Sequence, residues 1–447
     1  MKDEDLEYHL EDPEDIQNDK KNSLSKKAKI ILGSISILIL LIIVIIICLK
    51  IKNDDDDDHE HNEDDDHDDH EHNEDDEHDE SDIDYYEYSD NITSYINLSY
   101  ADNNTIFNSF KEGGSNYNED LGNINHGLDY TKSRFNSYNL YIPDSALDQK
   151  DKFNKIILLI HPGAWLGHNK EKLIPFCLYY AKMGYISATT GYTLLNQNDT
   201  DYNIFRILDE ITATIINMKK KLIQKGFNEN KLEMAIEGAS AGGHLALLYA
   251  YKMKNISPIP IKFILNAAGP VVLEPGKYLK LKDVDNPLDS IDQKSIENAI
   301  KEGKLEETDG LMTPKMIVML MNFFQGKKYS DQEIEEIFND DDQVNKENEK
   351  YKDLLRLVQY AIPLSYVDKT TLPTLCLYGG KDVDVGVAQY SYLKEKFDEN
   401  QNNNITLIYS KNADHPNVYA DDNNKDGINP EYVNQFFNFS NLYFTSN

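Results

Sequence analysis

The sequence predicts an α/β fold in which a mostly parallel sheet carries helices on both faces, preceded by a single transmembrane helix. From about residue 127 onward, short apolar runs alternate with helical patterns, and this alternation is typical of parallel sheets whose strands are joined by helices. Near the start of the chain, residues 30–49 form one unbroken apolar run. With 447 residues, 40% of them hydrophobic, the chain can bury a large core.

The charge of the chain is strongly acidic and unevenly distributed. The formal net charge is -34, and residues 54–80 hold 19 acidic residues and no Lys or Arg. An acidic chain repels phosphates, which excludes a nucleic-acid partner. Three cysteines are too few for a disulfide framework, and we expect Cys177 and Cys376 to be small core residues. We expect no cofactor and no fixed metal site.

The first 49 residues predict a membrane anchor. Residues 1–29 are polar and mostly acidic before a basic cluster, which we interpret as a cytosolic tail. Twenty uncharged residues, 30–49, rise about 1.5 Å each and span a hydrocarbon core of about 30 Å. A cleaved signal peptide is the alternative, but the continuation Leu49-Lys50-Ile51-Lys52 contains no small-residue cleavage site.

Lysines on the two sides of this run predict its orientation. Five precede it, Lys20, Lys21, Lys26, Lys27 and Lys29, and two follow it, Lys50 and Lys52. Because positive charge favours the cytosolic side, we expect a single-pass type II protein whose main domain is lumenal or extracellular.

Residues 50–126 are predicted to be an acidic, low-complexity stalk or linker. Within it, a nine-residue pattern starts at Asp57 and again at Asp68. Like charges favour an extended spacer, and six histidines among the carboxylates make loose binding of divalent cations the alternative. Glycosylation sequons fit a lumenal or extracellular domain; they start at Asn91, Asn97, Asn103, Asn198, Asn255, Asn404 and Asn438.

Residues 127–447 have the alternation of a globular α/β domain. The expected strands are 137–143, 155–160, 185–190, 231–236, 261–265, 372–378 and 405–409. The expected helices are 170–183, 204–225, 244–253, 387–397 and a last one near 430–438. Residues 271–361 break the alternation, since they are largely charged and helical. We interpret them as a helical cap insertion over the site, with helices at 291–302, 314–324 and 331–338.

The segment Glu237 to His244 contains Gly-x-Ser-x-Gly, with Ser240 at its centre. An apolar strand precedes it and a helix follows, which is the context of a nucleophile elbow, where a sharp turn exposes the serine hydroxyl. Gly238 and Gly242 would keep Cβ atoms out of the crossing of strand and helix. The helix N-terminus favours developing negative charge. A chance match in an ordinary turn is the alternative.

The loop His161-Pro162-Gly163-Ala164-Trp165 directly follows an apolar strand. A tetrahedral intermediate needs backbone N–H donors aimed at its oxyanion. We expect Gly163 and Ala164 to supply two of them and Ala241, next to the serine, a third. An ordinary strand-to-helix loop is the alternative, and Trp165 is expected to pack beneath the loop. His244 is expected to pack or to form a local hydrogen bond.

Two stretches after apolar strands supply a candidate acid and base. In Gly379 to Val385 (GGKDVDV) we expect Asp382 to orient a histidine, with Asp384 as the alternative. His415, after the last apolar strand, is the candidate general base.

Taken together, residues 127–443 resemble the α/β-hydrolase superfamily, specifically the carboxylesterases and the acetyl- or feruloyl-esterase-like hydrolases. HPGAW resembles their HGGxW oxyanion loop, and EGASAGGHLALL resembles their G-x-S-A-G-G-H elbow. Residues 361–385 resemble the stretch that leads to the catalytic acid, and the chain order of Ser240, Asp382 and His415 is that of the superfamily. Pro162 replaces the first glycine of the loop, but the next two positions are the usual donors.

The resemblance implies a serine hydrolase that acts on small carboxylic esters through an acyl-enzyme, with no cofactor. Amidases, formamidases and peptidases on the same scaffold are alternatives in the same class. A catalytically inactive binding ectodomain is the alternative from another class.

Overall fold

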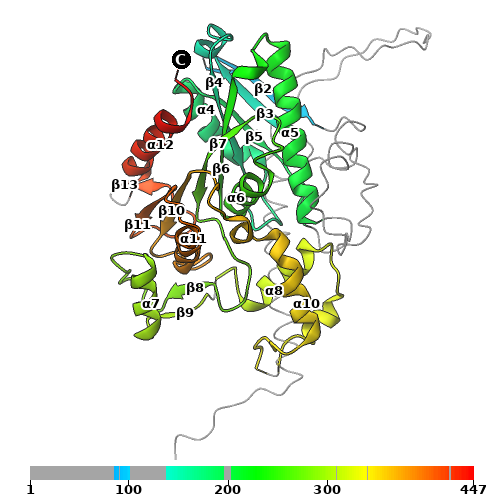
Figure 1. Ribbon diagram of the computed structural model, residues 1–447, viewed down its shortest axis with the longest axis vertical. Coiled ribbons are helices and arrows are strands. Elements are labelled where there is room, and N and C mark those ends of the chain that lie inside the picture. Colours follow the sequence, from blue (N-terminus) through cyan, green and yellow to red (C-terminus); the bar gives the residue numbers. More distant parts are fainter. Residues whose placement is uncertain are drawn as a thin grey trace, which may run out of the picture. The chain divides into compact units, whose positions relative to one another are not determined.

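A computed structural model of the protein describes residues 85–89, 91–100, 137–195, 203–308, 310–339, 341–421 and 424–446. These residues all belong to one unit, Asp79–Asn447. Its centre is a nine-stranded sheet (Figure 1). In spatial order the strands are β1 (Tyr85–Ser89), β2 (Ile92–Ser99), β3 (Ser137–Pro143), β5 (Ile186–Thr190), β4 (Asn154–Ile160), β6 (Leu232–Ala239), β7 (Ile261–Ala267), β10 (Thr374–Gly379) and β11 (Ile405–Ser410).

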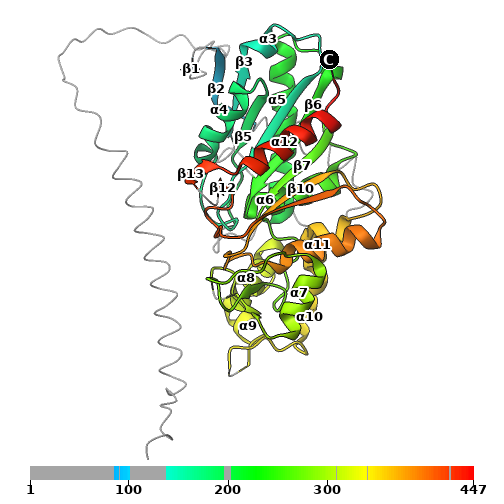
Figure 2. The ribbon, with the colours of Figure 1, turned by 90° about the vertical axis from the view of Figure 1, so that its left-hand side faces the viewer.

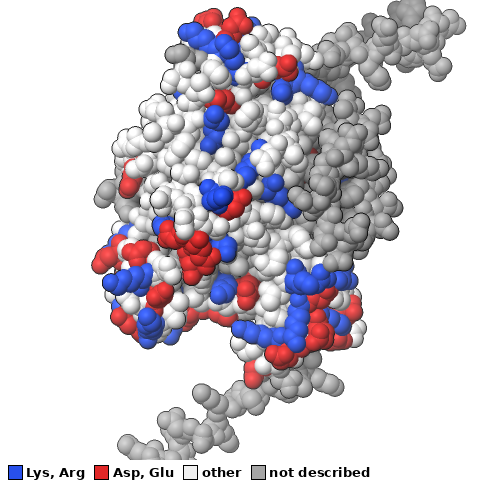
Figure 3. Space-filling view, in the orientation of Figure 1, with Lys and Arg blue, Asp and Glu red and all other residues white. Residues whose placement is uncertain are grey.

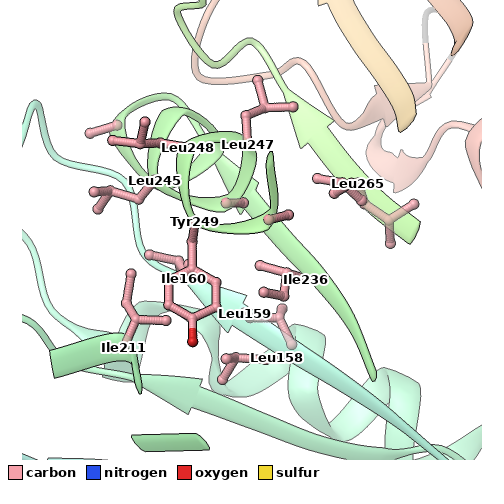
Figure 4. Close-up of a cluster of buried hydrophobic side chains, with 14 of the residues drawn as sticks. Leu158, Leu159, Ile160, Ile211, Ile236, Leu245, Leu247, Leu248, Tyr249 and Leu265 are labelled. Carbon is pink, nitrogen blue, oxygen red and sulfur yellow. The ribbon is translucent and has the colours of Figure 1, made fainter. Parts of the chain in front are cut away.

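The sheet is parallel from β5 to β11 and antiparallel at the β1–β2–β3 edge. The parallel strands read as continuous apolar runs because both of their faces are covered. In β4, for example, Ile156 to Ile160 are all buried. Figure 4 shows side chains of β4 and β6 packing against Leu245 and Tyr249 of α6 (Ala241–Met253) and Ile211 of α5 (Ile204–Gln224).

Helices cover both faces, as the sequence predicts. In Figure 1, α5 and α6 lie on one side of the sheet, and α4 (Ile174–Lys182) and α12 (Pro430–Tyr443) lie on the other. Outside the insertion the described part of the chain also forms α3 (Asp144–Leu147), α11 (Ala388–Glu399), a two-stranded ribbon of β12 (Ala420–Asp421) and β13 (Asn424–Ile428), and three short 3-10 helices, Lys170–Leu173, Glu229–Lys231 and Pro363–Tyr366. Cys177 and Cys376 are both buried, which confirms their predicted place in the core.

The start of the domain needs a correction. Strand β2 pairs with β3 from Ile92↔Pro143 to Ser99↔Ser137, and β1 pairs with β2. Both strands fall in the range 50–126, which the sequence predicts to be a stalk or linker, so the sheet begins well before residue 127. These edge strands are rich in Ser, Thr, Asn and Tyr and lack the apolar run by which the other strands were found.

Residues 271–361 leave the sheet between β7 and β10, which are hydrogen-bonded neighbours. They form β8 (Leu279–Leu281), α7 (Gln293–Lys301), β9 (Leu305–Glu307), α8 (Pro314–Phe324), α9 (Asp331–Glu335) and α10 (Glu349–Val358). Their helices gather beyond one end of the sheet, near α11 (Figure 2). Charges of both signs crowd this part of the surface (Figure 3), where Lys350 pairs with Glu336 at 2.7 Å and with Glu333 at 3.4 Å.

The predicted tail (1–29), transmembrane helix (30–49) and acidic tract (54–80) lie outside the described residues. Among the helices that the structure does describe, none combines the length and the apolar character needed to cross a membrane.

Candidate active site

Ser240 occupies a strained turn between β6 and α6. Its φ of 53° and ψ of -123° lie in a region that non-glycine residues rarely adopt and that costs about 1–3 kcal/mol. The Ser240 N–H donates to the Ala267 carbonyl oxygen at 2.8 Å, and its own carbonyl accepts from the His244 N–H at 3.0 Å. Both ends of the turn are therefore fixed, and the conformation is that of a nucleophile elbow.

Two glycines make this turn sterically feasible. A Cβ atom on Gly238 would lie 2.2 Å from the carbonyl oxygen of Gly242, and one on Gly242 would lie 2.1 Å from that of Ile160. The second clash shows that the end of β4, from which the His161–Trp165 loop departs, is packed directly against the start of α6. The role that the sequence predicts for both glycines is confirmed.

The three candidate catalytic side chains form one hydrogen-bonded chain. His415 Nε2 lies 2.9 Å from Ser240 Oγ, and His415 Nδ1 lies 2.7 Å from Asp382 Oδ2. Asp382 is buried and accepts two further hydrogen bonds at its Oδ1, from the N–H groups of Asp384 and Val385, both at 2.9 Å. With Nδ1–H donating to Asp382, Nε2 is free to accept the serine proton.

The surroundings of His415 favour its protonated form. Burial is the largest single influence and lowers its pKa, but the charge of Asp382, its hydrogen bond and the nearby Asp384 and Asp414 together raise the pKa above the ordinary value of 6.5. The imidazolium that forms when the histidine takes up a proton is therefore stabilised.

Asp384, the alternative candidate for the catalytic acid, forms a hydrogen bond elsewhere. Its Oδ1 accepts the N–H of Leu311, in the insertion, at 2.7 Å. Asp382 therefore contacts His415, while Asp384 connects the loop after β10, which contains both aspartates, to the insertion.

The loop after β4 makes a sharp turn with an unusual backbone conformation. Gly163, Ala164 and Trp165 have consecutive positive φ values of 123°, 51° and 61°. The turn is closed by the N–H groups of Leu166 and Gly167, which both donate to the Gly163 carbonyl at 2.9 Å. Positive φ values are uncommon for non-glycine residues such as Ala164 and Trp165, so the backbone of this turn is unusual.

The predicted oxyanion donors, the backbone N–H groups of Gly163, Ala164 and Ala241, form no hydrogen bond with the described part of the protein. The carbonyl of His161 accepts from the Tyr192 hydroxyl at 3.0 Å, and the two rings stack with centroids 4.0 Å apart. These contacts hold His161, the first residue of the loop, in a fixed position.

Trp165 and His244 are structural, as the sequence predicts. Trp165 is buried and meets the rings of His244 and Phe324 edge-on, with centroids 5.0 and 5.1 Å away. Burial lowers the pKa of His244 to about 4, so the ring is neutral, and its Nε2 donates to the Ala361 carbonyl at 2.7 Å.

Phe324 and Ala361 both belong to the predicted insertion, so the insertion packs against the His161–Trp165 loop through Trp165 and against α6 through His244. The role of Phe324, which also stacks on His244 at 5.6 Å, was missed by sequence reasoning, because no local pattern reports a contact between α8 and α6.

A second feature was also missed. Glu237, in the elbow strand, is buried, and the hydroxyls of Tyr180, Tyr419 and Tyr432 lie within hydrogen-bonding distance of its carboxyl group. The sequence signal for it was an acidic side chain within a buried strand, since β6 (LEMAIEGA) carries Glu233 and Glu237 among apolar residues.

Nothing in the described part of the chain suggests a metal centre: no group of three or more His, Cys, Asp or Glu side chains is arranged to hold an ion there. The histidine-rich tract at 54–80 lies outside that part.

Comparisons with solved structures give esterases of low sequence identity. Esterase B from Lactobacillus rhamnosis is 17% identical over 70% of this chain and 83% of its own, with a TM-score of 0.44. A truncated carbohydrate esterase from gut microbiota is 16% identical over 78% and 96%, with a TM-score of 0.46. A thermophilic esterase from the planctomycete Thermogutta terrifontis is 15% identical over 70% and 92%, with a TM-score of 0.44. No curated protein matches the sequence.

The comparison with protein families gives a match that covers most of the α/β domain. The BD-FAE family matches residues 139–397, which is more than half of the chain and includes the oxyanion loop, the elbow and Asp382. The chain therefore belongs to the BD-FAE family of α/β-hydrolase-like esterases.

Proposed function

We propose that the protein is a serine hydrolase that cleaves carboxylic esters through an acyl-enzyme. The observation that carries the proposal is the unbroken chain from Ser240 Oγ through the His415 ring to the buried Asp382 carboxylate. A serine hydroxyl is a weak nucleophile until an adjacent base accepts its proton, and the base works best when a third group orients it.

The reaction would proceed in two halves. Ser240 Oγ attacks the ester carbonyl carbon while His415 Nε2 takes the hydroxyl proton, and the resulting oxyanion accepts hydrogen bonds from the N–H groups of Gly163, Ala164 and Ala241. The histidine then gives the proton to the leaving alcohol, which leaves the acyl group on the serine. Water, deprotonated by the same histidine, attacks the acyl-enzyme; the bond from the acyl carbon to Ser240 Oγ then breaks, His415 returns the proton to Oγ, and the acid is released.

Membership of the family and the presence of all three triad residues favour an active esterase over an inactive binding ectodomain. An amidase, a formamidase or a peptidase would use the same residues, so the scissile bond must be found by experiment. The substrate class that we propose from the family and the three candidate catalytic residues is a small-molecule ester.

The direct test is hydrolysis of p-nitrophenyl esters of increasing acyl length by the full-length protein, beside the corresponding anilides. Ester cleavage should exceed anilide cleavage, and Ser240→Ala should reduce turnover by about 10⁶, the typical loss when a triad serine is removed. Ser145→Ala, which changes an exposed serine in α3, is the control and should be unaffected. Activity of Ser240→Ala within tenfold of the wild type would refute the assignment.

For location, we propose a single-pass type II membrane protein anchored by residues 30–49, with its catalytic domain lumenal or extracellular and the acidic tract as its stalk. The length of the apolar run and the excess of lysines before it support this orientation. The sequon residues Asn91, Asn97, Asn255, Asn404 and Asn438 are all exposed, as glycosylation requires. Loose binding of divalent cations by the tract remains the alternative to a pure spacer.

A further inference from the structure

Glu237 lies three residues before the candidate nucleophile, and its carboxyl group is buried and forms no ion pair with the described part of the chain. It is 1% exposed. Its partners are hydroxyls: Tyr180 Oη lies 2.6 Å from Oε2, and Tyr432 Oη and Tyr419 Oη lie 2.7 and 3.0 Å from Oε1. Tyr180 and Tyr432 also contact each other, at 3.0 Å. We call these four residues the Glu237 cluster.

The number of protons available for hydrogen bonds in the cluster indicates whether the carboxyl group of Glu237 is neutral or ionised. It contains four oxygen–oxygen contacts of hydrogen-bond length, and each hydrogen bond needs one proton. Burial raises the pKa of all three tyrosines well above 10, so each hydroxyl keeps its proton and supplies one. An ionised Glu237 would supply none, and two lone pairs would then face each other across one contact.

A neutral Glu237 satisfies every contact. In the neutral form the Oε2–H group would donate to Tyr180 Oη, across the contact in which an ionised Glu237 would accept from Tyr180. Tyr180 would then donate to Tyr432, while Tyr432 and Tyr419 donate to Oε1. A buried carboxylate without a cation would be costly. The residues beside Glu237 on the neighbouring strands are Leu159 and Leu265. Cys177 on α4 is a further titratable group near Glu237: burial, and then the charge of an ionised Glu237, would raise the pKa of its thiol.

We propose that Glu237 is a positioning residue which, as a neutral carboxylic acid, ties the loop that carries His415 to the strand that carries Ser240. Tyr419 follows His415 by four residues, and its carbonyl accepts the Asn429 N–H at 2.9 Å. The cluster also joins α4 through Tyr180 and α12 through Tyr432. The proposal rests on the proposed function, since it assigns Glu237 a part in holding the 2.9 Å approach of His415 to Ser240.

Protonation is tested without reference to activity. In infrared difference spectra of the full-length protein at neutral pH, the wild type should show the carbonyl band of a protonated carboxylic acid that Glu237→Gln lacks. Absence of this band would overturn the neutral assignment even if the esterase activity is present. If instead the band is present and the protein cleaves no ester, the proposed function fails while the protonation stands.

The pH dependence of stability gives a second independent readout. Burial raises the pKa of Glu237 above its ordinary value of 4.5, although the three hydroxyls oppose this shift. The folded protein then holds a proton that the unfolded chain releases, so this contribution is fully present below pH 4.5 and is lost as pH rises through the folded pKa. Glutamine does not titrate, so Glu237→Gln lacks this loss of stability. The melting temperature of the variant minus that of the wild type should therefore increase as pH increases. A constant or opposite difference would contradict the proposal.

Positioning is tested by kcat and by rescue. Glutamine can donate its N–H to Tyr180 and accept from Tyr432 and Tyr419, so Glu237→Gln should keep kcat within about threefold. Glu237→Leu and Tyr419→Phe should lower kcat by tenfold or more with little change in KM, because a misplacement of about 1 Å can cost about 10² in rate.

Tyr185→Phe is the matched control. It removes another buried hydroxyl bound to α12, the 2.7 Å contact with Ser440 Oγ, outside the Glu237 cluster. It should lower stability and leave kcat unchanged. If Tyr419→Phe behaves in the same way as Tyr185→Phe, the cluster is merely structural and the positioning role is wrong.

Discussion

Two carboxylates separated by one residue have different partners in this structure. Asp382 meets the His415 ring, and Asp384 meets the Leu311 N–H of the insertion. From the sequence, either residue could be the acid, since both follow an apolar strand at a similar spacing. The choice depends on which side chain turns inward, and two backbone N–H groups that bind Asp382 Oδ1 fix that orientation.

This difference predicts unequal effects of the two amide variants. Asp382→Asn should reduce kcat by about 10⁴, because an amide allows the wrong histidine tautomer. Asp384→Asn keeps a carbonyl oxygen that can accept the Leu311 N–H, so its kcat should stay within tenfold. Steady-state hydrolysis of a p-nitrophenyl ester by both variants measures this. A larger loss from Asp384→Asn would show that the assigned acid is wrong.

At the scale of elements, the site depends on the turn that follows β4. Gly163 has a φ of 123°, and a Cβ atom there would lie 2.1 Å from the Gly167 carbonyl oxygen. An added methyl group must therefore displace the backbone that carries the proposed oxyanion donors.

Gly163→Ala should lower kcat by about 10² or more, the typical loss when one oxyanion donor is removed. Gly303→Ala is the control: Gly303 also has a positive φ, of 66°, but nothing lies within 4 Å of its added Cβ. It should cost about 1 kcal/mol of stability and leave kcat unchanged. Equal kcat losses in the two variants would mean that backbone strain alone explains the effect and that the loop holds no oxyanion.

Much of this architecture could be predicted from the sequence, because the signals are local. The bounds of β3 and α8 agree with the predicted ranges, and Ser240, Asp382 and His415 each follow an apolar run that ends in the same edge of the sheet. The contacts that were missed join distant residues. Glu237 meets tyrosines 57, 182 and 195 positions away, and neither helical nor strand periodicity can report such pairs.

At the scale of the whole molecule, we propose that residues 30–49 anchor the protein in a membrane and that the catalytic domain is lumenal or extracellular. Protease added to sealed vesicles should remove only the N-terminal tail, and detergent should expose the catalytic domain to digestion. Endoglycosidase should increase the mobility of the domain on a gel, since the described sequon residues are exposed. Digestion of the domain without detergent, together with an absence of glycan, would show that the orientation is reversed.

The central claim is that Ser240 is an activated nucleophile, and covalent labelling tests it most directly. The full-length protein, treated with a fluorophosphonate probe and digested, should carry one adduct on the peptide that contains Ser240. Labelling should be lost in Ser240→Ala and strongly slowed in Asp382→Asn. A folded wild-type protein that takes up no probe, or an adduct on a different serine, would contradict the account.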